Sequence, residues 1–149
     1  MIFIFLENEF FLITRGLSFF LKVRRFVLLT WTIRTRILFD DWLEIQNYQV
    51  KKKVLSMLLI LSEYGPHLGR PYADRLKLSK FIHMKELRIQ VSGVPIRVCF
   101  AFDPRSCGIV LCAGNKKGCD ENQFYIKLIK SADAEYASHL VKPEGLWVR

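Results

Sequence analysis

The sequence predicts an α+β fold in which helices pack on one face of a small, mainly antiparallel sheet. Apolar and polar residues alternate on both sides of Ser92-Gly93, a pattern typical of two strands joined by a hairpin turn. Along residues 38–48, 50–64 and 124–140, apolar residues instead recur at helical spacing. Helices and strands in separate runs of the chain are typical of the α+β class.

The predicted order of elements is strand, two helices, three strands and helix. Residues 31–36 alternate and are rich in β-branched and aromatic side chains, which predicts a short first strand. Two helices follow, and Gly65-Pro66 ends the second of them. Residues 67–82 are predicted to form a polar loop that carries several basic side chains.

The hairpin is followed by a third strand and a last helix. The strand is predicted over residues 107–113, and a tight basic loop over 114–118 comes after it. Asp120 followed by Gln123 resembles a capping box, which predicts the start of the last helix. Residues 141–149 are expected to form a loose C-terminal tail.

Composition narrows the class of protein. A chain of 149 residues with 51% apolar residues suits one domain with a core of its own. Its formal net charge of +9 points to nucleic acid, an anionic membrane or an acidic protein as the partner. The cysteines at 99, 107, 112 and 119 form no C-x-x-C pair, so we expect free thiols and no zinc site.

Residues 1–30 differ from the rest of the chain. They hold seven of the twelve phenylalanines, but charged residues interrupt every apolar run, so no membrane-spanning segment is predicted. Three interpretations are open: an interfacial helix, an additional packed element, or translated sequence upstream of the true start. The third is preferred, because the composition changes abruptly and a complete small domain follows over residues 31–140.

The hairpin carries one arginine in each strand. Centring the turn on Ser92-Gly93 places Arg88 directly opposite Arg97, on the face away from the apolar residues. Opposed like charges are unfavourable by about 0.2–1 kcal/mol, so the sheet has no structural need for this pair. A phosphate between the two guanidinium groups would remove the penalty. The helices are expected to cover the apolar face and to leave the arginine face open. The alternative is therefore that both arginines are simply solvated on an exposed face.

Several motifs occur together, in order, between residues 31 and 140: LGRPYADRLKLSK, MKELRIQ, PIRVCFAFDP, GNKKG and FYIKLIKSADAEYASHL. In these motifs the chain resembles the phage-derived, HigB-like branch of the RelE/ParE toxin superfamily of type II toxin–antitoxin systems. The resemblance implies a RelE-like fold and a cytoplasmic endoribonuclease that cleaves mRNA, usually on the ribosome, without metal or cofactor. It also implies a helix-turn-helix antitoxin, encoded by an adjacent gene, as the partner.

The resemblance assigns site residues position by position. Arg88 and Arg97 match the two strand arginines of the family, and Lys85 matches the lysine of the same KELR motif. Lys116 lies where the basic loop has its lysine, and Tyr125 where an aromatic residue begins the last helix. Three further side chains are expected to bind RNA: Lys80, His83 and Lys117.

The chain departs from the family pattern at several positions. Phe81 and Ile82 replace a basic pair, Val94 replaces an arginine, and Asn115 and Lys117 replace two residues of the loop. These departures leave an alternative function open. The chain would then be a non-catalytic or decayed relative that binds a protein target, such as gyrase, or only its antitoxin.

Metal-independent RNA cleavage defines what the assigned side chains would do. The ribose 2′-OH attacks the neighbouring phosphate, so the site must accept a proton, stabilise the phosphorane oxygens and protonate the leaving 5′-oxygen. Arg88 and Arg97 are assigned to the phosphate, and Lys85 or Lys116 to proton abstraction or charge stabilisation. Lys85 is the weaker candidate, because its register places it on the helix-facing side.

Two more side chains are candidates for proton transfer. Tyr125 is positioned to stack on a base or donate a proton, or else to flank the core beside Phe124. His83 is a candidate acid, or else a structural residue at the start of its strand. Replacing Arg88 or Arg97 by alanine is expected to abolish toxicity without unfolding the protein, since both are placed on an open face.

Overall fold

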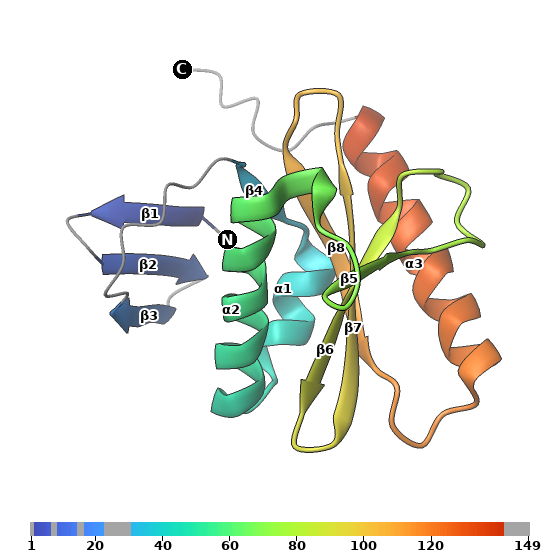
Figure 1. Cartoon of the computed structure of the whole chain (residues 1–149), viewed down its shortest axis with the longest axis horizontal. Coiled ribbons are helices and arrows are strands. Elements are labelled where there is room, and N and C mark those ends of the chain that lie inside the picture. The colour runs from blue at the N-terminus through green and yellow to red at the C-terminus, as the bar shows by residue number, and fades with distance from the viewer. Residues whose placement is uncertain (1, 7–8, 15–16, 23–30, 142–149) are drawn as a thin grey trace.

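The computed structural model describes residues 2–6, 9–14, 17–22 and 31–141. From residue 31 onward it contains three α-helices and a five-stranded sheet with the strand order β4-β8-β7-β6-β5 (Figure 1). β4 pairs parallel to β8, and the other neighbours are antiparallel. The predicted α+β class and RelE-like order of elements are confirmed. The elements are β4 (Ile33–Thr35), α1 (Ile37–Glu44), α2 (Tyr48–Tyr64), the 3₁₀ turn η1 (Gly65–His67), β5 (Ala73–Arg75), β6 (Lys85–Val91), β7 (Val94–Phe102), β8 (Gly108–Asn115) and α3 (Glu121–Val141).

The first described residues form a second, three-stranded antiparallel sheet. Its strands are β1 (Ile2–Leu6), β2 (Glu9–Thr14) and β3 (Leu17–Lys22), paired in that order. These residues are extended, so they do not form the interfacial helix that was one interpretation. That residues 1–30 lie outside the functional domain stays a prediction, and the predicted tail after Val141 lies outside the described residues.

The hairpin between β6 and β7 has the predicted register. Val91 pairs with Val94 around a two-residue loop, and Arg88 pairs with Arg97. Ser92 and Gly93 have φ angles of 48° and 78°, as a type I′ turn requires of both central residues. The turn and the alternation of side chains are local, which is why they could be predicted.

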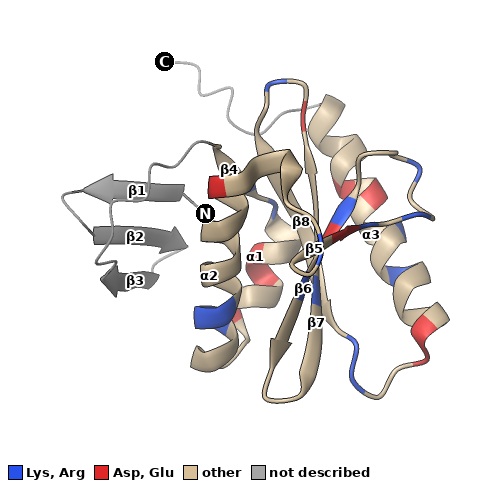
Figure 2. Cartoon of the chain, in the orientation of Figure 1, with Lys and Arg blue, Asp and Glu red and all other residues tan. Residues whose placement is uncertain are grey.

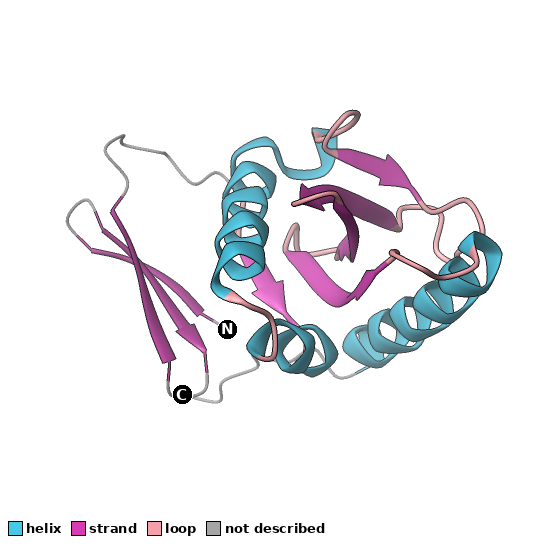
Figure 3. Ribbon diagram, turned by 90° about the horizontal axis from the view of Figure 1, so that it is seen from below, coloured by secondary structure: helices cyan, strands magenta, loops and turns pink. Residues whose placement is uncertain are grey.

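Helices cover both faces of the sheet, and the prediction that they pack on one face is wrong. α1 and α2 pack on the face that carries Leu87, Ile96 and Val98, whereas α3 packs on the opposite face against Ala101 and Leu111 (Figure 3). The reason is visible in β7, where residues 96–101 are all buried. A strand that is apolar on both faces needs a layer on each of them. The arginine face is therefore partly covered by α3.

The loop predicted over residues 67–82 contains an additional strand. β5 pairs with the start of β6, so that Ala73 lies opposite Leu87 and Asp74 opposite Glu86. Three residues are too few for an alternating pattern to be recognised. At the beginning of this segment Gly65 ends α2 as predicted, with a φ angle of 60°. A Cβ atom there would lie 2.3 Å from the Trp31 ring, so no other residue fits.

A bulge in β8 directs two consecutive side chains towards α3. Cys99 pairs with Cys112 and Phe100 with Val110, so Leu111 is an extra residue in β8. Both Leu111 and Cys112 pack in the core under α3. Cys99 and Cys112 are buried free thiols, as predicted. A hydrogen bond with Cys112 and burial raise the pKa of the Cys99 thiol well above its ordinary value.

The C-terminal half of α3 is fastened to the turn between β7 and β8. The Tyr136 hydroxyl donates to the Phe102 carbonyl at 3.0 Å, and His139 Nε2 lies 2.9 Å from Asp103 Oδ2. Burial raises the pKa of Asp103, but hydrogen bonds from His139 and two backbone N–H groups outweigh it and lower the pKa overall. Asp103 is therefore the acceptor and the imidazole N–H the donor. In the described part of the chain no helix is long and apolar enough to cross a membrane.

Candidate active site

The two opposed arginines meet a carboxylate of the same chain. Glu86 Oε1 accepts a hydrogen bond from Arg88 Nη1 at 3.0 Å and lies 3.5 Å from Arg97 Nε. Glu86 precedes Arg88 by two residues in β6, so both side chains project from the same face. Figure 2 shows acidic and basic positions side by side where β5, β6 and β7 meet. An anion was expected between the arginines, and this structure has Glu86 beside them.

Tyr125 from α3 joins this network. Its hydroxyl accepts from Arg97 Nε at 3.3 Å and lies 3.1 Å from Glu86 Oε1, to which it donates. The preceding Phe124 packs over Gly114, where a Cβ atom would lie 2.9 Å from the ring. α3 can therefore approach β8 closely enough for Tyr125 to reach the sheet. Tyr125 contacts Arg97 and Glu86 and does more than flank the core.

The members of this network differ in how far their side chains are exposed to solvent. The side chains of Glu86 and Arg97 are 4% and 8% exposed, whereas that of Arg88 is 34% exposed. Burial raises the pKa of Glu86, although Arg97, Tyr125 and Arg88 oppose it. Burial likewise raises the pKa of Tyr125, which keeps its hydroxyl protonated at neutral pH. An anion from solvent would therefore meet Arg88 first.

Lys116 lies beside Tyr125. Its Nζ is 5.3 Å from the centre of the Tyr125 ring and forms an ion pair with Glu121. A cation over an aromatic face is attracted to it. Lys116 thus belongs to one group of contacting side chains, which we call the Glu86 cluster: Glu86, Arg88, Arg97, Lys116 and Tyr125.

Lys85 points away from the Glu86 cluster. Its Nζ donates to the carbonyl of Pro66 at 2.9 Å and also to that of Leu68, on the side of the sheet covered by α2. Burial lowers the pKa of Lys85, and the negative charge of Asp74 partly opposes this. The register had placed Lys85 on this side, and the structure does not bring it together with the arginines.

Lys80, His83 and Lys117 are exposed on loops. Lys80 and His83 belong to the segment between β5 and β6, which Asp133 of α3 holds in place. Asp133 accepts from the Ser79 hydroxyl at 2.6 Å and from the Lys80 backbone N–H at 3.0 Å. Residues 53 and 54 positions apart in the chain form these bonds, and no local pattern could have predicted them.

Phe81, which replaces a basic residue of the family pattern, packs in the same place. Its ring meets the Tyr136 ring edge-on at a centroid distance of 4.8 Å. Phe81 thus attaches the loop to α3 by apolar contact. Across the described ranges, no group of three His, Cys, Asp or Glu side chains is arranged to hold a metal ion.

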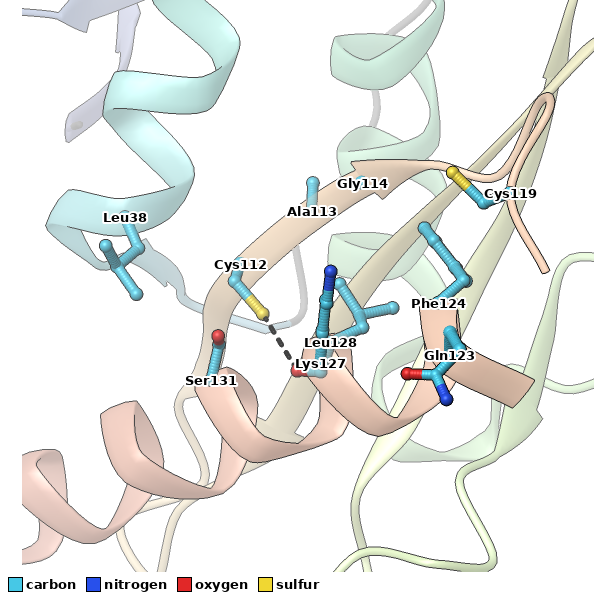
Figure 4. Close-up of a pocket in the computed structure, with 10 residues that line it drawn as sticks. All are labelled: Leu38, Cys112, Ala113, Gly114, Cys119, Gln123, Phe124, Lys127, Leu128 and Ser131. Carbon is cyan, nitrogen blue, oxygen red and sulfur yellow. Dashed lines mark hydrogen bonds between the residues drawn. The ribbon is translucent and has the colours of Figure 1, made fainter. Parts of the chain in front are cut away.

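A pocket between α1, β8 and α3 lies apart from the Glu86 cluster (Figure 4). Leu38, Cys112, Phe124 and Leu128 line it, and Lys127 is the charged residue of its lining. No member of the Glu86 cluster contributes to it. An apolar pocket of this kind does not suit a phosphate, so we place the candidate site at the cluster.

A family model described as "Phage derived protein Gp49-like (DUF891)" matches residues 41–137, about two thirds of the chain. The chain belongs to the Gp49-like family. All five members of the Glu86 cluster fall inside the matched range, and residues 1–30 fall outside it. The expected membership of the phage-derived branch is confirmed.

Two proteins of Mycobacterium tuberculosis (strain ATCC 25618 / H37Rv) are similar to this Gp49-like chain. It is 39% identical over 104 residues to "Putative toxin HigB2", a match that covers 69% of this chain and 51% of HigB2. It is 36% identical over 106 residues to "Putative toxin HigB3", covering 71% of this chain and 90% of HigB3. The chain thus spans about half the length of one curated relative and nearly all of the other.

Sequence reasoning missed Glu86 in this Gp49-like chain. A signal was present, because Glu86 and Arg88 are two residues apart in a predicted strand and must share a face. What the pattern could not indicate is the burial of that face, which α3 causes. An exposed glutamate next to two arginines would have had little consequence.

Proposed function

We propose that this Gp49-like chain is the toxin of a type II toxin–antitoxin module and cleaves mRNA, on the ribosome and in the cytoplasm. The observation that carries the proposal is the Glu86 cluster, in which two guanidinium groups, a phenol and an ammonium group converge. The names of HigB2 and HigB3 support the toxin part of the proposal. Its net charge of +9 suits an RNA substrate.

Four members of the cluster have a role in the proposed reaction: Arg88, Arg97, Lys116 and Tyr125. The ribose 2′-hydroxyl loses its proton to solvent water as its oxygen attacks phosphorus, and the bond to the 5′-oxygen breaks, leaving a 2′,3′-cyclic phosphate and a 5′-hydroxyl. Arg88 and Arg97 bind the phosphate oxygens as their charge increases. Tyr125 holds a proton for the leaving 5′-oxygen, and Lys116 adds positive charge beside it. Lys85 faces the other side of the sheet, so we assign it no direct role.

Arg88→Ala tests the proposal most directly, because Arg88 is the exposed arginine of the cluster. Removing one donor of this kind should lower the cleavage rate about 10²–10³-fold. The measurement is primer extension on a reporter mRNA in cells that express the wild type or the variant. Arg105→Ala, an exposed arginine in the turn after β7, is the matched control. Cleavage by Arg88→Ala at the wild-type rate would contradict the assigned role.

The proposed partner is a helix-turn-helix antitoxin from an adjacent gene. Induced expression of the chain should arrest growth, and co-expression of that neighbour should relieve the arrest. Normal growth with verified soluble protein would argue strongly against a toxin.

The alternative is a non-catalytic toxin that binds a protein target such as gyrase, or a decayed relative that binds only its antitoxin. Phe81 and Ile82, which stand where the family has a basic pair, favour this alternative. Growth arrest with intact mRNA would indicate the protein-targeting form, and no arrest with retained antitoxin binding would indicate the decayed form.

A further inference from the structure

Glu86 lies where the proposed function needs a phosphate. Its Oε1 accepts from Arg88 and from Tyr125, and it is 3.5 Å from Arg97 Nε. Its Oε2 is buried, and within the described ranges it has no hydrogen-bond partner. A buried carboxylate oxygen without a hydrogen-bond donor lowers the stability of the folded protein. Glu86 therefore calls for an explanation beyond separating the two arginines.

Charged and titratable groups face Glu86 from four elements. Arg88 lies on its own strand β6, Arg97 and Cys99 on β7, and Tyr125 on α3. Asp74 on β5 is directly opposite Glu86 in the strand pairing and is bound to Arg70. The two arginines therefore already have carboxylates near them before any ligand arrives.

We propose that Glu86 is a built-in counter-ion that competes with a phosphodiester of bound nucleic acid for Arg88 and Arg97, and that binding of the phosphodiester drives uptake of one proton by the Glu86 carboxylate. The inference rests on the proposed function only for the position of the phosphate. It concerns binding, so it does not require that the RNA be cleaved.

The proton uptake follows from the charges. A phosphodiester that reaches the exposed side of Arg88 brings a second anion next to Glu86, and two anions at one site favour protonation of one of them. A phosphodiester stays ionised, so the proton from solvent goes to Glu86. Oε2 is the free atom, and a proton there leaves Oε1 to accept from Tyr125 and Arg88. Burial already raises the pKa of Glu86, so the proton is taken up readily.

Proton uptake by Glu86 determines whether binding of the anion strengthens or weakens with pH. Protonated Glu86 no longer competes for the arginines, so binding of the anion strengthens as the pH falls. When the nucleic acid dissociates, the proton returns to solvent. Glu86 therefore holds the two arginines in position while the site is empty. When a phosphate binds, Glu86 becomes protonated and the arginines pair with the phosphate.

The test uses the full chain and a 2′-O-methyl RNA oligonucleotide, which cannot be cleaved by attack of its 2′-oxygen. Binding is measured over a series of pH values on both sides of neutrality, because burial raises the pKa of Glu86. Calorimetry of the wild type in two buffers with different heats of ionisation should show net proton uptake. Glu86→Gln should bind about tenfold more tightly at neutral pH, because one negative charge near the phosphate is removed.

Glu86→Gln should also have a shallower pH dependence than the wild type. Every other titratable group is the same in both proteins, so the difference between their slopes isolates Glu86. Glu44→Gln, an exposed glutamate on α1, is the matched control and should behave as the wild type. Absence of proton uptake by the wild type would overturn the inference, and that measurement decides even where Glu86→Gln fails to fold. A folded Glu86→Gln that binds no tighter, with an unchanged slope, would overturn it as well.

The outcomes separate this inference from the proposed function. A chain that binds the oligonucleotide with proton uptake but leaves unmodified RNA intact supports the inference and contradicts the nuclease. A chain that cleaves RNA in an Arg88-dependent manner without proton uptake supports the nuclease and contradicts the inference.

Discussion

At the scale of single residues, the two arginines of the hairpin have different surroundings. Arg97 is buried and contacts Glu86, Tyr125 and the Ile96 carbonyl, which accepts from its Nη1 at 3.0 Å. Arg88 is partly exposed and binds Glu86 from the solvent side. The expectation that neither arginine matters for folding was based on an open face. That premise is wrong for Arg97, because α3 covers its side chain.

Arg97→Ala should therefore destabilise the protein. Removing one partner of a buried ion pair leaves the other charge uncompensated, which typically costs about 3–5 kcal/mol. Arg88→Ala should cost about 1 kcal/mol or less, since Arg88 is screened by solvent. The measurement is urea unfolding of each variant.

The double variant Arg97→Ala/Glu86→Gln provides the control. If the cost arises from the uncompensated Glu86, the double variant should be more stable than Arg97→Ala alone. Equal stability of Arg97→Ala and the wild type would show that the ion pair does not contribute to folding.

At the scale of elements, the segment between β5 and β6 is attached to α3. Asp133 accepts from Ser79 and from the Lys80 backbone, and Phe81 packs on Tyr136. The attachment holds the basic side chains of this segment beside the helix that carries Tyr125. In the proposed function, an unattached polar segment would have to be ordered on binding of RNA, at a cost in affinity.

Asp133→Ala should release this segment. Amide hydrogen exchange of residues 76–84 should become faster, because two hydrogen bonds that hold the segment are lost. RNA binding should weaken by about tenfold or less, in line with the loss of one or two hydrogen bonds. Hydrogen exchange followed by mass spectrometry checks the first effect, and binding of the uncleavable oligonucleotide checks the second.

Asp41→Ala, which removes an exposed carboxylate from α1, is the charge-matched control. Unchanged exchange of residues 76–84 in Asp133→Ala would mean that other contacts hold the segment, such as Phe81 on Tyr136 and the bond from Arg75 to the Ile82 carbonyl.

At the scale of the whole molecule, the five-stranded sheet has a hydrophobic core on each face. The core under α1 and α2 and the core under α3 are both formed by residues between Ile33 and Tyr136. Trp31 packs against this part of the chain. Its backbone N–H donates to the Ser62 carbonyl at 3.0 Å, and its ring packs edge-on against Phe102. Every core residue that the structure describes thus lies in the part of the chain that begins at Trp31.

Deleting residues 1–30 should therefore leave a folded and active protein. The reason is that the residues of both cores and the Glu86 cluster are retained. A melting curve of residues 31–149 checks that the shortened protein is folded. Primer extension on a reporter mRNA in cells that express it checks that it is active. Deletion of residues 1–35 is the control, because it removes β4 and its pairing with β8, and it should lower the melting temperature. Insoluble protein after the shorter deletion would show that residues 1–30 are part of the fold.

The sequence by itself determined the local features of this protein. The register of the hairpin, the opposed arginines, the end of α2 at Gly65 and the start of α3 after Asp120 all depend on residues close together in the chain. Alternation and helical spacing report which side of an element is apolar, and turn residues report where it ends. The order of elements and the family motifs were accessible for the same reason.

Only the tertiary structure decided which element covers each face. α3 packs on the arginine face, so Glu86 and Arg97 are buried, Tyr125 contacts both, and Asp133 reaches Ser79 across more than fifty residues. It also showed that Lys85 binds carbonyls beside α2, away from the arginines. Periodicity gives the direction of a side chain from its own element. The partner on the other side, and therefore burial and pKa, depends on contacts between distant parts of the chain that no local pattern contains.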